Sequence, residues 1–186
     1  MRAVVPIAAL FLAFSLAVPA ARADVKSERA DVREAADKVL ATLYGAQPSA
    51  KRAVEGAAGH AVFSNFGMKL FVAGGGTGKG IAVNRKTKKE TYMKMVEVQA
   101  GLGIGIKKFG VVFVFESEQA LNAFVNSGWE FGGQATAAAK MGAEGAAYQG
   151  AVSVSPGVWM YQVTDTGLAA EITAKGTKYY KDDKLN

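Results

Sequence analysis

Two groups of residues in this sequence place positive charge where an anion could bind. The first is the glycine run from Gly74 to Gly80, in which Lys79 is the charged member. Glycines leave backbone N–H groups accessible and the lysine adds a cation, so the run is a candidate anion site. A nucleotide is not expected there, because a P-loop needs a glycine where Ala73 stands and a serine or threonine where Gly80 stands.

The same run has a structural interpretation, which the sequence leaves open. No register within it gives the G-x-G-x-x-G spacing of a dinucleotide site, and the residues that follow read as a strand rather than a helix. Glycines inside a strand pattern usually mark a tight bend, a bulge or a close approach of another chain segment. The run is therefore either an anion-binding loop or a place where packing demands glycine.

The second group is a basic connection between two predicted strands, residues 80–84 and 91–98. Its four cations are Arg85, Lys86, Lys88 and Lys89. Such a hairpin tip is either a solvated turn that discourages aggregation or a contact for acidic head groups, worth about 1 kcal/mol per cation at an anionic membrane. Lys51 and Arg52, in the first turn of a predicted helix over 49–55, oppose the helix dipole and are candidates for the same role.

Catalytic groups are sparse, so an enzyme is not expected. The sequence has no cysteine and a single histidine, His60, which stands beside an apolar strand with no carboxylate near it in sequence. A metal set or a nucleophile–base pair needs more such groups close together. Carboxylates such as Glu116, Glu118 and Glu130 could meet only through folding. We expect no catalytic residue, no metal and no cofactor.

The first residues predict export. A short basic start, an apolar run from Ala3 to Ala17 and the small-x-small triplet ending at Ala23 have the form of a signal peptide over 1–23. Cleavage near Ala23 would leave a periplasmic or secreted protein beginning at Asp24. Its formal charge would be +4 rather than +6, because Arg2 and Arg22 leave with the signal.

The remaining 163 residues are expected to form one α+β domain preceded by a helix. Apolar residues at three- and four-residue steps predict an amphipathic helix over 24–44, and a second change of period predicts a helix over 117–126 with Ser117 as N-cap and Gly128 as its end. Alternation and short connections predict a curved, mainly antiparallel sheet with glycine-rich strands. Its expected strands are 60–72, 79–84, 91–98, 100–106, 109–116 and C-terminal segments at 158–163 and 168–172.

Residues 99–108 alternate glycine with apolar side chains, which predicts a strand with one nearly bare face. A bare face allows another element to lie close to the sheet, and Phe109, Phe113 and Phe115 are candidates to cover it. Replacing Gly103 by valine is expected to destabilise the fold by about 1–3 kcal/mol if that face is covered.

Three stretches resemble the SYLF domain family. They are AVFSNFGMKLFVAGGGTGKGIAVNR at 61–85, VQAGLGIGIKKFGVVFVFES at 98–117 and GLAAEITAKGTKYYKDDKLN at 167–186. The resemblance covers 48–186, with 24–47 as an N-terminal amphipathic helix. It implies binding of phospholipids, phosphoinositides especially, and in some members binding of actin. It also implies that the N-terminal helical part, here with Lys51 and Arg52, takes part in lipid contact.

The sequence therefore predicts a non-enzymatic module that binds anionic phospholipids of the phosphoinositide type at a membrane surface. Binding is expected to be electrostatic first, with part of the first helix's apolar face at the interface. The alternative is an actin-binding or other protein-interaction scaffold, and no nucleic acid partner is expected. The predicted lipid-binding residues are Lys51, Arg52, Lys79, Arg85, Lys86, Lys88 and Lys89.

Overall fold

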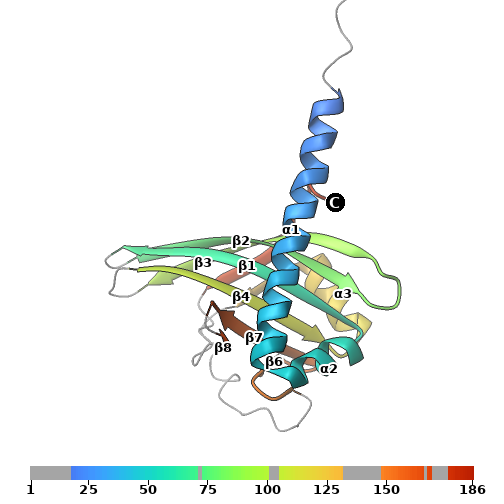
Figure 1. Cartoon of the computed structure of the whole chain (residues 1–186), viewed down its shortest axis with the longest axis vertical. Helices are drawn as coiled ribbons and strands as arrows, with labels where there is room; N and C mark the ends of the chain where they lie inside the picture. Colours follow the sequence, from blue (N-terminus) through green and yellow to red (C-terminus); the bar gives the residue numbers. More distant parts are fainter. Residues whose placement is uncertain (1–17, 71–72, 101–104, 132–147, 166, 169–175) are drawn as a thin grey trace, which may run out of the picture.

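The computed structural model describes residues 18–186 apart from 71–72, 101–104, 132–147, 166 and 169–175. The described chain is one α+β domain, as the sequence predicts, with helices on both faces of a curled antiparallel sheet (Figure 1). Its helices are α1 (Val18–Ala46), α2 (Pro48–Gly56) and α3 (Glu118–Ser127).

The strands that the structure describes form one sheet in the order β5-β9-β3-β2-β1-β4-β7-β6, with β8 paired to β7. Every pairing is antiparallel, which confirms the predicted sheet type. The strands are β1 (Gly59–Leu70), β2 (Ala73–Asn84), β3 (Glu90–Ala100), β4 (Gly105–Phe115), β5 (Trp129–Phe131), β6 (Val152–Ser155), β7 (Val158–Thr164), β8 (Gly167–Leu168) and β9 (Thr177–Lys181).

The glycine run is part of a strand, so its interpretation as a loop is wrong. β2 pairs with β1 from Asn84 to Ala73 without interruption, and all of Gly74–Gly80 lies in that ladder. A Cβ added at Gly78 would lie 2.6 Å from Met95 Cγ, and one at Gly80 would collide with the ring of Phe63 and a backbone carbonyl. Glycine is there because neighbouring groups occupy the space of a side chain, which is the structural alternative that the sequence left open.

Two other predicted boundaries change. Of the strand expected at 100–106, Gly105 and Ile106 lie in the same strand as 109–115, β4, because β1 pairs with it continuously from Lys69 to Gly59. Ala100 is the last residue of β3, and 101–104 lie outside the described residues. Gly101 and Gly103, on which the bare-face expectation depends, lie outside the described residues. Phe113 and Phe115 are fully buried. Both contact Phe124 of α3, with ring centroids 5.1 Å apart in each pair.

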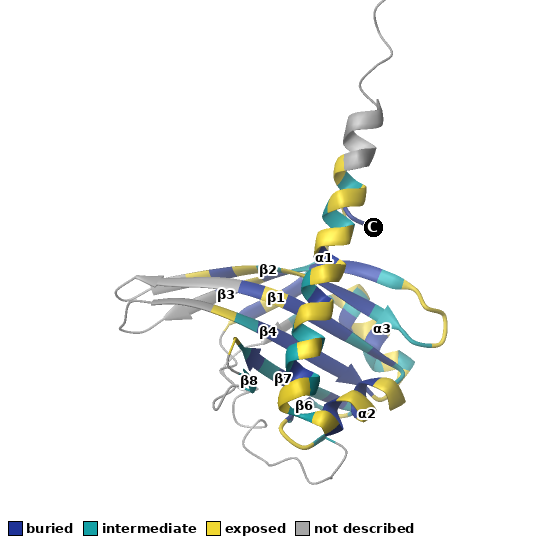
Figure 2. Cartoon of the chain, in the orientation of Figure 1, coloured by how far each residue is buried: buried dark blue, intermediate teal, exposed yellow. Residues whose placement is uncertain are grey.

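The central strands are buried on both faces (Figure 2). On the α3 face, aromatic rings meet at centroid distances of 4.8–6.3 Å around Phe63, Phe113 and Phe124. On the opposite face, α1 and α2 cover a second apolar cluster that contains Val62 and Val112. Burying each such side chain contributes about 1.5–3 kcal/mol, so both clusters hold the sheet in shape.

Helix α1 packs its apolar stripe on the sheet, which corrects the expectation that this stripe lies at a membrane. Val32, Ala36 and Leu43 are at most 5% exposed, and their three- and four-residue steps place them on one side of the helix. The polar side of α1 faces outward (Figure 2). None of the described helices has an apolar stretch long enough to cross a bilayer.

Helix α3 follows the sequence prediction closely. Ser117 is its N-cap, and the Ser117 Oγ accepts a hydrogen bond from the backbone N–H of Ala120 at 3.2 Å. Gly128 ends the helix with a φ of 68°, in the left-handed region that glycine adopts without strain. The cap contributes about 1 kcal/mol and fixes where α3 begins.

Candidate functional site

The basic connection is a tight, internally bonded turn between β2 and β3. The side-chain oxygen of Asn84 accepts hydrogen bonds from the backbone N–H groups of Lys86 and Thr87, at 3.0 and 2.9 Å. The backbone N–H of Asn84 donates to the carbonyl of Lys89 at 2.9 Å, and Lys88 adopts a φ of 58°. The turn is thus held by its own contacts while the side chains of Lys86, Lys88 and Lys89 remain exposed.

Arg85, in contrast, has a partner inside the protein. Its Nη1 donates to the carbonyl of Val54 at 3.1 Å, at the C-terminal end of α2, where helical carbonyls lack partners and the dipole is negative. Burial, and after it the charge of Arg85, lower the pKa of His60 to about 4, so that imidazole is neutral at pH 7. Arg85 therefore joins the turn to α2 through one of its guanidinium nitrogens.

Lys51 and Arg52 are exposed on α2, as the sequence predicts for contact residues. Lys79 is placed differently. Its Nζ lies 2.7 Å from Glu28 Oε1 of α1, and it stands six residues from Arg85 along β2, roughly 20 Å away. The structure therefore leaves the turn and α2 cations exposed, and engages Lys79 and Arg85 in contacts within the protein.

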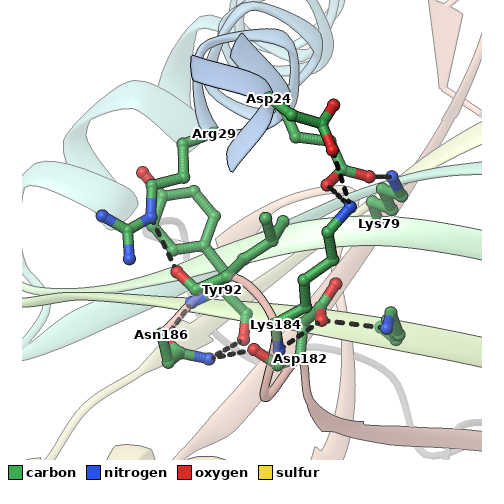
Figure 3. Close-up of polar contacts among 10 residues, drawn as sticks. Asp24, Arg29, Lys79, Tyr92, Asp182, Lys184 and Asn186 are labelled. Carbon is green, nitrogen blue, oxygen red and sulfur yellow. Dashed lines mark hydrogen bonds and ion pairs between the residues drawn. The ribbon is translucent and has the colours of Figure 1, made fainter. Parts of the chain in front are cut away.

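Lys79 belongs to an ion-pair network that fastens α1 to the strands and to residues 182–186 (Figure 3). The Nζ of Lys184 lies 2.7 Å from Glu28 Oε2. Hydrogen bonds from Lys184 and Lys79 lower the pKa of the Glu28 carboxyl to about 2. Asp182 is 2% exposed and pairs with Lys94 at 2.9 Å. These ion pairs connect α1, the strands and residues 182–186, and they neutralise most of the charge of the side chains involved.

A groove of about 980 Å³ runs beside α1 over this network. Its charged lining residues are four lysines and four carboxylates, so its formal charges cancel. They are Lys38, Lys79, Lys94, Lys108, Glu28, Asp31, Glu34 and Asp165.

Two arginines of α1 lie over the ring of Tyr92 and were missed in the sequence. The guanidinium carbons of Arg29 and Arg33 are each 5.5 Å from that ring's centroid. Arg33 also contacts Glu90 Oε2 with its Nε at 2.9 Å and its Nη2 at 2.6 Å. The four-residue spacing indicates that both arginines share one side of a helix, but their contact with residues 90–92 depends on tertiary packing.

Within the described part of the chain, no group of three or more histidine, cysteine, aspartate or glutamate side chains is placed to hold a metal ion. The chemistry that these residues display is therefore positive charge on an ordered turn and a nearby helix.

Comparisons with known proteins identify the family of this chain. Residues 96–186 match the Ysc84 family model, described as a Las17-binding protein actin regulator. Beta cell expansion factor A of Aeromonas veronii is 37% identical over 162 residues, which cover 86% of this chain and 59% of that protein. The chain thus spans 59% of the length of this relative. The protein belongs to the SYLF (Ysc84) family, which is linked to actin regulation and to lipid binding.

Proposed function

We propose that this protein is a non-enzymatic module that binds anionic phospholipids, of the phosphoinositide type, at a membrane surface after export. The observation that carries the proposal is the turn between β2 and β3. Lys86, Lys88 and Lys89 are exposed there, and none of them has a carboxylate partner among the described residues. Three free cations at about 1 kcal/mol each support attachment to an anionic surface.

Vesicle co-sedimentation tests this proposal. The triple variant Lys86→Gln, Lys88→Gln, Lys89→Gln is expected to bind anionic vesicles at least tenfold more weakly at 0.1 M salt. Arg85 is left unchanged because its contact with Val54 is structural. The melting temperature should stay nearly constant, since exposed charges contribute little to folding.

A matched control removes the same charge elsewhere. The control carries Lys26→Gln, Lys108→Gln and Lys178→Gln, three exposed lysines outside the turn. It is expected to bind within about threefold of the parent, because exposed charges beyond roughly 10 Å of the docking point are screened. Equal loss in the two variants would mean that net charge, and not the turn, carries binding. Unchanged binding of the turn variant would contradict the proposal directly.

A protein-interaction scaffold of the actin-regulating kind remains the second candidate. The observation that favours it is the place of the family match, since residues 96–186 contain neither the turn lysines nor Lys51 and Arg52. Co-sedimentation with filamentous actin, without lipid, tests this function separately. Binding to actin by the parent and by the turn variant alike would favour it.

A further inference from the structure

A second hollow of about 500 Å³ lies at the edge of the sheet where β3 begins. β9 pairs with β3 only from Met93 onward, so the first residues of β3 extend past the end of β9. The side chain of Asn186 takes the place of a strand there, accepting from the backbone N–H of Tyr92 at 2.9 Å and donating to its carbonyl at 2.8 Å. The hollow, called here the edge cavity, is bounded by these residues, α1, α3 and the turn.

The edge cavity has an excess of positive charge. Arg29, Arg33, Lys89 and Lys181 line it, and Glu90 supplies the single side-chain carboxylate among its described lining residues. That carboxylate is bound by Arg33. Lys181 donates to the neutral side-chain oxygen of Asn126 at 2.8 Å. Arg29, Lys89 and Lys181 therefore line the cavity without an ion-pair contact to a side-chain carboxylate in the described part of the chain, although the charge of Arg29 also acts on Glu90.

Arg29 is positioned as an anion ligand should be. Its Nε donates to the carbonyl of Leu185 at 2.8 Å, and its guanidinium lies over the ring of Tyr92 (Figure 3). These two contacts fix the plane of the group while both Nη atoms remain without a hydrogen-bond partner among the described residues. A fixed guanidinium with two free amino groups matches the geometry of phosphate oxygens.

The edge cavity also adjoins the turn, because Lys89 belongs to both. A membrane that contacts Lys86 and Lys88 would thus present its head groups near the cavity. A phosphomonoester carries nearly two negative charges at pH 7, which matches three unpaired cations better than the single charge of a phosphodiester does.

We propose that the edge cavity binds a phosphomonoester group through Arg29, Lys89 and Lys181. The inference rests on the proposed function for its setting at a membrane, and it deepens that function by naming the chemical group that is selected. The group can come from a phosphorylated lipid head group or from a free phosphate ester, and the two sources call for different probes.

The test compares two kinds of vesicle of equal total charge, one containing phosphatidylinositol 4-phosphate and the other phosphatidylglycerol, with the full chain. The parent is expected to prefer the phosphomonoester vesicles by about tenfold. Arg29→Lys, which keeps the charge but loses the planar fork, and Lys181→Gln should each reduce that preference to about twofold or less. Binding to phosphatidylglycerol should change little.

Two further variants separate the edge cavity from general attachment. Lys178→Gln removes a cation from the same strand as Lys181, outside the cavity, and should retain the preference. The pair Lys86→Gln, Lys88→Gln should weaken binding to both kinds of vesicle and leave their ratio unchanged. Melting temperatures identify any loss of fold in Arg29→Lys. Lys181→Gln tests the cavity independently, because Lys181 donates to the exposed side chain of Asn126.

The possible results separate failure of the edge cavity from failure of the proposed function. A preference that Arg29→Lys and Lys181→Gln leave intact overturns the edge cavity and leaves the proposed function standing. A parent without preference overturns both the edge cavity and the phosphoinositide part of the proposed function, even if the turn still binds anionic vesicles. Absence of binding to any anionic vesicle overturns the proposed function itself. Competition by soluble glycerol phosphate that is lost in Lys181→Gln supports the cavity with a free ester as ligand. A preference that resists this competitor and depends on Lys181 supports it with lipid as the source.

Discussion

Two hollows among the described residues, the groove and the edge cavity, differ in charge as well as in size. The groove beside α1 measures about 980 Å³ and the edge cavity about 500 Å³. Lysines in the groove face carboxylates in equal number, and Lys79 is already bound to Glu28. The edge cavity has four cationic side chains and one side-chain carboxylate among its described lining residues. The charged side chains of the larger hollow thus balance one another, whereas those of the smaller hollow leave an excess of positive charge.

The largest expected effect tests whether the glycine run belongs to packing. Gly80→Ala should lower the free energy of unfolding by about 2–3 kcal/mol, because its Cβ would meet the ring of Phe63 and a carbonyl that cannot move without the strand. Urea unfolding measures the change. Gly45→Ala is the matched control, since nothing lies within 4 Å of a Cβ at Gly45 and that variant should be neutral or slightly stabilised. Equal stability of the two variants would contradict the packing role.

An intermediate effect is expected from charge in the two hollows. Glu90→Gln removes the carboxylate of the edge cavity and should tighten binding to anionic vesicles about fivefold, at roughly 1 kcal/mol per unit charge. Asp165→Asn removes one from the groove and should change binding less than twofold. Co-sedimentation at 0.1 M salt measures both. If the two substitutions act alike, the contrast between the hollows has no functional meaning.

The smallest effect concerns acid stability on the groove side. The folded pKa of Glu28 is about 2, against an ordinary value of 4.5, so its ion pairs stabilise the fold above about pH 4.5 and that contribution is lost as pH falls toward 2. Unfolding by urea at pH 6 and pH 3 should show a slightly larger loss for the parent than for Glu28→Gln. The difference is small because the pairs are partly exposed. Parallel losses in both proteins would show that Glu28 is not the responsible group.

Local signals in the sequence predict some of these elements and not others. The N-cap at Ser117 and the stop at Gly128 depend on neighbouring residues, so α3 could be located from the sequence alone. The apolar stripe of α1 was also visible, but a stripe of that period suits a membrane and a sheet equally well. Glycines in β2 signalled a loop, because the reason for them lies across the sheet in Phe63 and Met95.

The same division applies to the candidate site. Exposed lysines in one turn are adjacent in sequence, so the basic turn could be predicted. Arg29, Lys89 and Lys181 come from α1, the turn and β9, and only the fold brings them to one cavity. Sequence reasoning also could not separate a free cation such as Lys88 from Arg85, whose partner is a carbonyl 31 residues earlier.

The hydrogen bond between Arg29 and the carbonyl of Leu185 joins residues 156 positions apart, so it can form only after nearly the whole chain has been synthesised. A ribosome adding roughly 5–20 residues per second completes Leu185 about 8–30 s after Arg29. During that interval α1 has been made, but the carbonyl of Leu185 that binds Arg29 has not. Helix α1 also packs on β1 and β2, which are made long before Leu185. Its apolar contacts with these strands can therefore form during synthesis, and the bond to Leu185 is added last.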